Sequence, residues 1–501
     1  MKKRTITLAA LVLSMLLFYA SCNEKRLDLQ PLTPTEASFF TEEDDFNRAV
    51  LGTYAKLTDY YWYAGGSWLH GFWLLPGDDI TTSGTVPFEI FGTLQPANGT
   101  INTFYRVSYQ LINRANTVLQ KLEQESGVIS SSERKNRFRG EVLFLRGYAN
   151  FLLWNYFGTS PLITKRIQSA EEITQPSSSG TALLDQAIAD FTEAAATLPT
   201  TWDGSNRGRV TRNSANGMLG KALVFRASVT GNTADYTAAI MAFNALSGLS
   251  LMPNFRSNFD VREENNAESL FEYQASQPGG GDNPWLPNDF EANGVGSTST
   301  YWGFYENHYT LFGGAPFLAT QKLVDAFEPG DPRRLITLDP ATKVFNKYWN
   351  TGDQKSQSDV ASVNNPRILR YADVLLLKAE ALVESGGSTT EAIGLVNQIR
   401  TRARTMVAGG TAPANFSTAE TSRTQIMEWI RAERLRELAG EEGIRWLDLR
   451  RWHLGGKINL AGWDWSSVRN DISFDPARHT LYPIPTGETD LNPNVSQNAG
   501  Y

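Results

Sequence analysis

"RAERLRELAGEEGIRWLDLRRW", residues 431–452, combines dense charge with helical spacing. Glu433 lies three residues before Arg436, and Arg434 lies three residues before Glu437. Residues at this spacing face one another on a helix, so the two pairs give weak support to a helix. We expect a structural helix here whose end is tied down by salt bridges.

Two tryptophans, Trp446 and Trp452, stand among the charges of this stretch. We expect them to pack beneath the arginines. The alternative is that the charges form a catalytic cluster. The structural interpretation is favoured, because ion pairs on a helix are common and carry no chemistry by themselves.

Helical periodicity extends on both sides of this stretch. Phe46, Val50, Tyr54, Leu57 and Tyr61 fall at offsets of 4, 8, 11 and 15, which is one apolar stripe of a helix. The other segments that we expect to be helical are 104–123, 139–158, 182–198, 213–229, 370–385, 390–403 and 422–440. Successive helices with Ala and Gly on their inner faces predict helix pairs stacked like tetratricopeptide repeats, although no strict 34-residue period is visible.

Two segments depart from this helical texture. Residues 277–317 contain nine aromatic residues and eight glycines in 41 positions, about twice the aromatic density of the whole chain. Loops of that composition cannot bury every ring between helices. The end of the chain, 481–501, is rich in Pro, Asn and Gly, so we expect it to lie extended over the helical body.

The N-terminus has the pattern of a lipoprotein signal peptide. Basic residues at positions 2–4 precede an apolar run of 15 residues, 6–20, which is too short to span a membrane. The chain's single cysteine, Cys22, follows directly after two small residues. A disulfide has no second cysteine within the chain, and a free thiol is the other alternative. We expect 1–21 to be removed, Cys22 to be lipidated, and 22–45 to form an anchor and tail.

The remaining composition limits the partners of the chain. The formal charge of the chain is −7, and it becomes −10 once the three basic residues of the signal peptide are removed. An acidic protein of this kind disfavours nucleic acid, whose binding depends on neutralising phosphates with Lys and Arg. No second apolar run reaches membrane length.

Enzyme motifs are not found in the sequence. The four histidines show no paired metal-ligand spacing, and there is neither a nucleophile elbow nor a glycine-rich phosphate loop. The adjacent carboxylates Asp78 and Asp79 suggest glycoside hydrolysis, in which two carboxyls flank the scissile bond. Neighbouring residues seldom point at one bond, so capping or hydrogen bonding is the favoured role of this pair.

Four landmarks together resemble the SusD/RagB family. These are surface lipoproteins that capture nutrients, typically glycans, for outer-membrane transporters in Bacteroidetes-type bacteria. The landmarks are "LRGYANFLLWNYFGTSPLIT" (145–164), "RYADVLLLKAEAL" (370–382), "ERLRELAGEEGIRWLDLRRW" (433–452) and the end of the chain from "LYPIP" (481–501). They occur in the order of the family and, with the expected lipidated N-terminus, span nearly the whole mature chain.

The resemblance implies a mainly α fold. It is a tetratricopeptide-like α/α superhelical scaffold with long loop insertions and few short strands. We expect a helical N-terminal part at 46–270 and a C-terminal part at 271–501, with ligand loops at about 277–317. Both parts should belong to one compact body.

The resemblance also implies a function without catalysis. The protein is expected to capture an oligo- or polysaccharide and deliver it to a SusC-like TonB-dependent transporter, while anchored in the outer membrane and facing the exterior. The alternatives are a surface glycoside hydrolase and a binder of a peptide or glycopeptide. No cofactor and no metal ion are expected.

The expected ligand surface is aromatic. A pyranose presents apolar C–H faces that stack on flat rings, while carboxylates and amides take its hydroxyls. The alternative is that the rings only pin long loops to the body. The residues expected to contact ligand are Trp285, Tyr301, Trp302 and Tyr305 in the glycine-rich loops, with Phe88, Phe91 and Asp79 as contributors from the loop after the first helices.

Overall fold

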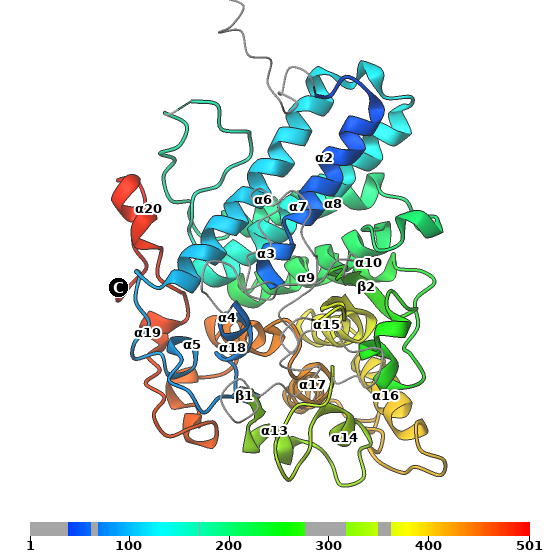
Figure 1. Cartoon of the computed structure of the whole chain (residues 1–501). Helices are drawn as coiled ribbons and strands as arrows, with labels where there is room; N and C mark the ends of the chain where they lie inside the picture. Colours follow the sequence, from blue (N-terminus) through cyan, green and yellow to red (C-terminus); the bar gives the residue numbers. More distant parts are fainter. Residues whose placement is uncertain (1–38, 62–68, 170, 276–316, 349–361) are drawn as a thin grey trace, which may run out of the picture.

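The computed structural model describes most of the chain after residue 38. The described ranges are 39–61, 69–169, 171–275, 317–348 and 362–501. Figure 1 shows that helices make up most of this part, with only a few short strands. The predicted fold class, mainly α with few strands, is therefore confirmed.

The helices and strands have the following bounds. The α-helices are α2 (Glu43–Ala55), α3 (Thr58–Tyr61), α4 (Leu69–Leu74), α5 (Pro87–Ile90), α6 (Gly99–Gln124), α7 (Ser132–Phe157), α8 (Ala182–Thr197), α9 (Arg212–Thr230), α10 (Thr233–Asn244), α13 (Gln321–Ala326), α14 (Arg333–Thr337), α15 (Tyr371–Glu384), α16 (Thr389–Thr405), α17 (Arg423–Leu438), α18 (Ile444–Leu454), α19 (Pro476–His479) and α20 (Thr486–Leu491). The strands are β1 (Ile80–Thr81), β2 (Ser269–Glu272), β3 (Leu318–Ala319) and β4 (Arg367–Arg370).

The first helical block runs from α6 to α10. Each of these helices packs on the next along the chain, and α7 contacts both α6 and α8 (Figure 1). Side-chain caps explain where several of them begin. Asn98 accepts from the backbone N–H groups of Thr100 and Ile101 at the start of α6, and Ser131 accepts from that of Arg134 at the start of α7. All the segments predicted to be helical lie largely within helices.

Glycines on the inner faces let these helices approach closely, as predicted. A Cβ at Gly147 of α7 would come within 3.0 Å of the ring of Phe191 on α8. A Cβ at Gly220 of α9 would come within 2.3 Å of the ring of Phe243 on α10. Both contacts require glycine because a side chain would push the paired helices apart.

The second helical block, α15 to α18, joins the first to complete the body. Helix α15 packs on α16 and α17 and also on α9 and α10, while α18 contacts α9. A large apolar core therefore runs through both blocks. Among the helices of the described residues, none combines the length and the apolar character needed to cross a membrane.

The described strands form two antiparallel pairs, each of which joins distant parts of the chain. Ile80 of β1 faces Ala319 of β3, and Ser269 of β2 faces Arg370 of β4. The pairing of β2 with β4 places the beginning of α15 beside the end of the first block. It also fixes Arg370 at the centre of the molecule.

The apolar stripe at the N-terminus spans two helices rather than one. Helix α2 ends at Ala55, and the short α3 begins at Thr58, with Leu57 between them. The stripe is nevertheless buried at Phe46, Val50 and Leu57. Burial of the apolar face, which continues through the break, explains why periodicity alone suggested one helix.

The C-terminal segment lies over the helical body, as predicted. The backbone N–H of Tyr482 donates to the carbonyl of Tyr156 at 2.7 Å, and the Asn498 amide donates to the carbonyl of Phe157 at 3.0 Å. One difference is that α20 forms a short helix within it. Pro485 precedes this helix, where its fixed φ suits the first turn.

Buried ion pairs occupy the centre of the molecule, where the stretch from 431 to 452 meets β4. Arg370 lies 2.7 Å from each of three carboxylates, those of Glu268, Glu437 and Glu441. Arg333 contacts Glu437 at 2.9 Å from α14. We call the following buried residues the charge network: Glu268, Arg333, Lys347, Arg370, Arg402, Glu433, Glu437 and Glu441.

The buried groups of this network stay ionised because opposite charges stabilise one another. Burial alone would raise the pKa of Glu437, but Arg402, Arg370 and Arg333 outweigh burial and hold that pKa well below its usual range. Burial lowers the pKa of Lys347 to about 8, although Glu441 opposes the shift at 2.6 Å. Removing any one partner leaves the others buried and uncompensated.

The structure corrects part of the pairing expected from the sequence. Glu433 and Arg436 do pair, at 3.2 Å. Arg434 instead contacts Asp448 at 2.6 Å and Asp373 at 2.8 Å. Glu437 pairs instead with Arg333, Arg370 and Arg402, which are distant in the sequence and which i,i+3 spacing cannot reveal.

The tryptophans of the same stretch are buried, as expected. The guanidinium groups of Arg431 and Arg451 lie 5.4 and 4.9 Å from the ring centre of Trp452. Trp446 is buried against Phe91. The expected arginine cover is therefore seen for Trp452, and the structural role of the stretch is confirmed.

Replacing Glu437 should destabilise the fold strongly. Glu437→Gln removes the charge that compensates three buried arginines, so we expect a loss of about 3–5 kcal/mol of unfolding free energy. Urea denaturation monitored by tryptophan fluorescence measures it. Glu133→Gln is the matched control, because its side chain is 74% exposed and pairs only at the surface, and it should cost less than about 1 kcal/mol. Equal losses in the two variants would contradict the importance of the network.

Candidate ligand-binding site

The aromatic residues on which we based the ligand surface lie beyond the described part of the chain. Trp285, Tyr301, Trp302 and Tyr305 fall within 276–316, which the structure does not describe. They stay a prediction. The described residues at the two ends of this range nevertheless show where on the body it begins and ends.

The undescribed range 276–316 begins beside a stacked pair of tyrosines. The rings of Tyr61 and Tyr273 lie 4.8 Å apart and nearly parallel, at 26°. Two residues further on, the backbone N–H of Ala275 donates to Asn365 at 2.7 Å. Tyr61, Ala275 and Asn365 stand next to, or close to, three different undescribed ranges. Three undescribed ranges therefore adjoin one small area of the described body.

The range ends at β3, beside a different group of side chains. Pairing of β3 with β1 brings Ala319 next to Ile80, close to Lys322 on α13. The ammonium of Lys322 lies 4.1 Å from the ring centre of Trp463, and the indole N–H of Trp463 donates to Asp78 at 3.0 Å. Lys322 also pairs with Asp78 at 2.6 Å, so the half-buried Trp463 and its neighbouring cation are both held in place by one buried carboxylate.

Sequence reasoning missed Trp463 and Lys322. The segment 459–468 contains Trp463 and Trp465 among Gly, Asn and Ser, the same composition that marked 277–317. This composition could have identified Trp463 from the sequence. Nothing in the sequence indicates the role of Lys322, because its position depends on the pairing of β1 with β3.

Phe88 and Phe91 lie in the core rather than on a surface. Phe88 is 3% exposed and packs on Phe72 and Tyr482, with ring centres 5.4 Å away in both cases. Phe91 is fully buried beside Trp446. The observed contacts of both rings are therefore structural, and their expected contribution to the ligand surface finds no support in these contacts.

Asp78 and Asp79 are also buried, and each carboxylate has structural partners. Asp78 is held by Arg445 at 2.5 Å and Lys322 at 2.6 Å; burial opposes them, but they keep its pKa well below the usual range. Burial raises the pKa of Asp79 to about 6, while its carboxylate accepts the backbone N–H of Gly440 at 3.0 Å. The expected hydrogen-bonding role of the pair is thus observed. Asp79 is nearly fully buried, so its expected contribution to ligand binding, like that of Phe88 and Phe91, finds no support in the observed contacts.

Arg469 fixes the loop after β1. Its guanidinium donates to the carbonyls of Thr82 and Gly84 at 2.9 and 2.8 Å and to Glu89 at 2.9 Å. The same carboxylate accepts from the hydroxyl of Thr81 at 2.5 Å. This side of the candidate site is therefore rigidly supported.

The buried carboxyl of Glu442 supports the stacked pair of Tyr61 and Tyr273. The hydroxyl of Tyr61 donates to Glu442 at 2.7 Å. Burial raises the pKa of Glu442 to about 8, although Tyr61 and Lys221 act in the other direction. The neutral acid and the tyrosine hydroxyl together fix the position of the stacked pair.

The chemistry available here suits binding. The described surroundings offer the partly exposed ring of Trp463 and a firmly anchored backbone. Groups of three or more His, Cys, Asp or Glu able to hold a metal ion do not occur within the described ranges. No pair of accessible carboxylates is found among the side chains described at this site.

Two family models match the chain. Residues 320–501 match the model described as the SusD family, and residues 84–223 match one described as starch-binding associating with outer membrane. Together they cover a large part of both helical blocks.

Individual proteins resemble the chain over nearly its whole length. SusD-like protein P2 of Formosa agariphila is 28% identical over 544 aligned positions, which cover 100% of both chains. The structure of a SusD homologue from Bacteroides thetaiotaomicron has a TM-score of 0.76 at 20% identity and covers 93% of this chain and 99% of that one. A laminarin-binding SusD-like protein has a TM-score of 0.73 at 24% identity and covers 92% of this chain and 100% of that one.

The stability of the protein should depend on pH through Glu442. Its folded pKa, about 8, lies above the reference value of 4.5, so its contribution is fully present below about pH 4.5 and is lost as pH rises through 8. The loss amounts to about 1.4 kcal/mol per pH unit within that window. Glu442→Gln removes this dependence while keeping an acceptor for Tyr61.

Calorimetric melts at pH 6 and pH 8.5 test this expectation. The melting temperature of Glu442→Gln should fall less between the two pH values than that of the unmodified protein. The Glu133→Gln control should behave like the unmodified protein. Parallel behaviour of all three proteins would show that Glu442 is ionised in the fold throughout this range.

Proposed function

Since this chain belongs to the SusD/RagB family, we propose that it is a non-catalytic, lipid-anchored glycan-binding protein of the outer membrane. In this proposal it captures oligo- or polysaccharide and passes it to a SusC-like TonB-dependent transporter. The observation that carries the proposal is the likeness to SusD-like protein P2 over the full length of both chains. The fold shared with a laminarin-binding SusD-like protein supports it.

The structure supports a division between scaffold and binding loops. Helices, buried glycines and the charge network fix the body, while the range from 276 to 316 begins at one supported edge and ends at another. Its aromatic residues would stack on sugar rings, each contact contributing about 1 kcal/mol. Because a millimolar dissociation constant corresponds to about −4 kcal/mol, a few rings give weak affinity and favour longer oligosaccharides over monosaccharides.

The anchor supports delivery to a membrane partner. Lipidation of Cys22 with more than one acyl chain gives stable attachment, since buried acyl carbons contribute about 0.8 kcal/mol each. The short tail at 22–45 would hold the body near the membrane and raise its effective concentration at a transporter. Recovery of a large barrel protein with the tagged protein from solubilised outer membranes would support this part.

Replacing two loop tryptophans tests the ligand surface. In Trp285→Ala/Trp302→Ala, affinity for the polysaccharide that the protein retains should fall at least tenfold, because two stacked contacts are lost. Affinity electrophoresis against laminarin, starch and a wider polysaccharide panel identifies that ligand, and calorimetric titration measures the loss. Trp429→Ala is the control, because this ring stacks on Phe416 at 4.3 Å on α17 and should not affect binding.

Thermal melts and a reducing-end assay complete this test. Unchanged affinity in a folded double variant would exclude the two rings, and lost folding would show that they belong to the core. Release of new reducing ends from a retained polysaccharide would indicate a glycoside hydrolase and contradict the proposal.

Cys22→Ala should free the protein from the membrane. Without an acylated cysteine the apolar segment is too short to anchor the chain by itself. Cell fractionation and metabolic labelling with a fatty acid report the change. A Ser21→Ala control keeps a small residue before the cysteine and should remain labelled and membrane-bound. Unchanged retention and labelling of the Cys22 variant would refute lipidation at this residue.

A further inference from the structure

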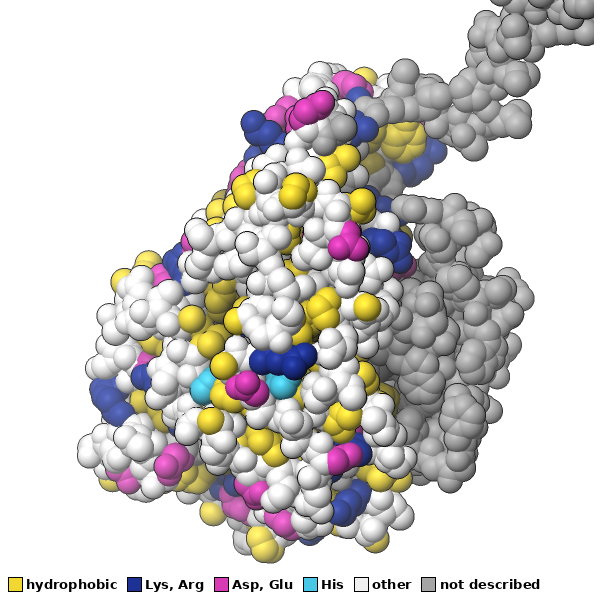
Figure 2. Space-filling view, turned by 90° about the vertical axis from the view of Figure 1, so that its left-hand side faces the viewer, with side chains coloured by type: hydrophobic (Ala, Val, Ile, Leu, Met, Phe, Trp, Pro, Cys, Tyr) yellow, Lys and Arg dark blue, Asp and Glu magenta, His cyan; other side chains and the backbone are white. Residues whose placement is uncertain are grey.

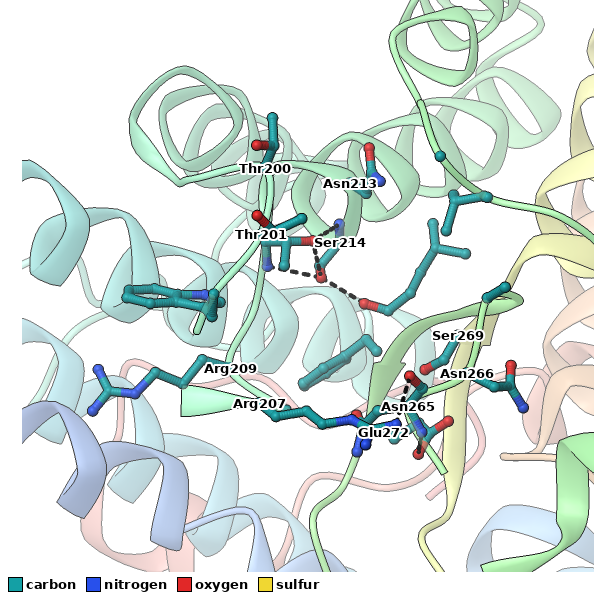
Figure 3. A pocket seen from close by; sticks show the side chains of 18 of the residues that line it. Thr200, Thr201, Arg207, Arg209, Asn213, Ser214, Asn265, Asn266, Ser269 and Glu272 are labelled. Atoms are coloured by element: carbon teal, nitrogen blue, oxygen red, sulfur yellow. Dashed lines mark hydrogen bonds between the residues drawn. The ribbon is translucent and has the colours of Figure 1, made fainter. Parts of the chain in front are cut away.

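A polar groove is lined by the connection between α8 and α9, by the start of α9 and by the segment that leads into β2. Figure 3 shows its lining: Thr200 and Thr201 follow α8, Asn213 belongs to α9, and Asn265 and Ser269 lie before and in β2. The cavity measures about 550 Å³. Its size lies within the usual range of small-ligand sites, 300–1,000 Å³.

A second cavity continues the groove toward α2 and α3. It measures about 480 Å³ and is bounded by Asn47, Tyr54 and Thr58 on its far side. The segment 207–209 and Glu272 line both cavities. The two cavities therefore adjoin at this shared lining, which leaves space on both sides of Arg207 for an oligosaccharide.

The walls of the groove are held in place before any ligand binds. Gly208 has a φ of +94°, and a Cβ there would come within 2.4 Å of Gln274, so the turn at 207–209 packs directly on the strand segment. The amide of Asn213 donates to the carbonyl of Ser247 at 2.8 Å. The Ser214 hydroxyl donates to the carbonyl of Leu270 at 2.5 Å across the groove floor.

The lining has the chemistry of a saccharide site. The hydroxyls of Thr200, Thr201 and Ser269 form no hydrogen bond with another residue of the described ranges, and Figure 3 shows them around the groove. Trp202 closes one end, and its indole N–H donates to Val210 at 2.8 Å. Hydroxyls for sugar hydroxyls and one aromatic ring are what an oligosaccharide requires.

Arg207 brings a positive charge with free hydrogen-bond donors to the groove. Its side chain is exposed, runs toward Asn265, and donates through Nη2 to the carbonyls of Glu264 and Asn265 at 2.6 and 3.3 Å (Figure 3). Within the described ranges, its Nε and Nη1 groups have no partner. Burial raises the pKa of the neighbouring Glu264 to about 8, although Arg367 and Arg207 act in the other direction.

The other charges of the groove are already paired. Arg209 points toward Glu141, at 3.1 Å, and toward Asn47, at 2.6 Å. Glu272 is buried, lies 3.8 Å from the guanidinium of Arg367, and accepts from the backbone N–H of Asn265 at 3.1 Å and the amide of Asn365 at 3.0 Å. In a chain with a formal charge of −7, Arg207 is thus a local cation open to an oxyanion.

We infer that this groove is a second saccharide-binding site and that it takes an acidic oligosaccharide whose carboxylate or sulfate pairs with Arg207. Its use in nutrient capture rests on the proposed function, but its binding chemistry does not. The groove would hold part of a long polysaccharide while the aromatic loops hold another part. Two weak sites on one chain would then act together through a high effective concentration.

Calorimetric titration of the protein lacking residues 1–22 tests the inference. The probes are a tetragalacturonide, a sulfated carrageenan tetrasaccharide and neutral maltotetraose. At least one acidic probe should bind to the unmodified protein, and Arg207→Gln should weaken that binding at least tenfold. Arg207→Lys should retain part of it. Arg212→Gln, an exposed arginine outside both cavities, should leave it unchanged.

Hydrogen exchange of the unmodified protein provides a measurement that does not depend on variants. The bound acidic probe should slow amide exchange at 200–214 and 264–269. If neither acidic probe binds, or if binding persists unchanged in Arg207→Gln, the inference is overturned. Protection confined to other segments would overturn it as well.

The Trp285→Ala/Trp302→Ala variant separates this site from the proposed function. Acidic-probe binding that this variant keeps and Arg207→Gln loses supports the groove, whatever becomes of polysaccharide capture by the loops. Binding that only the tryptophan variant loses overturns the groove while leaving the loop site intact.

Discussion

The buried pairing of Arg370 with Glu268, Glu437 and Glu441 is the constraint on which the rest of the fold depends. Arg370 belongs to β4, Glu268 to the segment before β2, Glu437 to the end of α17 and Glu441 to the turn between α17 and α18, so one guanidinium joins these segments. A buried ion is costly unless every partner is in place. The network therefore penalises any arrangement in which the two helical blocks are misplaced, even where its net contribution to stability is modest.

The scaffold could be predicted because its signals are local. Apolar periodicity, caps such as Asn98 and glycines such as Gly147 act within one or two turns of a helix, and the structure contains these helices where expected. The charge network could not be predicted in the same way. Arg333 and Glu437 are 104 residues apart, so the i,i+3 rule found one true local pair and missed the central one.

The candidate site was harder to predict from the sequence, because its contacts also join residues that are far apart in the chain. Phe88 stands in a loop-like stretch and looked available to ligand, but Tyr482, from the far end of the chain, covers it. Trp463 and Lys322 become neighbours only through folding. Composition identified a segment suited to sugar binding, but burial of individual rings depends on contacts that are distant in sequence.

We propose that a helical body held by buried ion pairs presents sugar-binding loops and performs no chemistry. A crystal structure of the protein with its tightest-binding oligosaccharide tests this claim most directly. The account predicts an intact oligosaccharide with its rings stacked on aromatic side chains of 277–317, and a charge network unchanged around Arg370. A cleaved sugar, or a sugar bound only at surfaces remote from those loops and from the groove at Arg207, would contradict it.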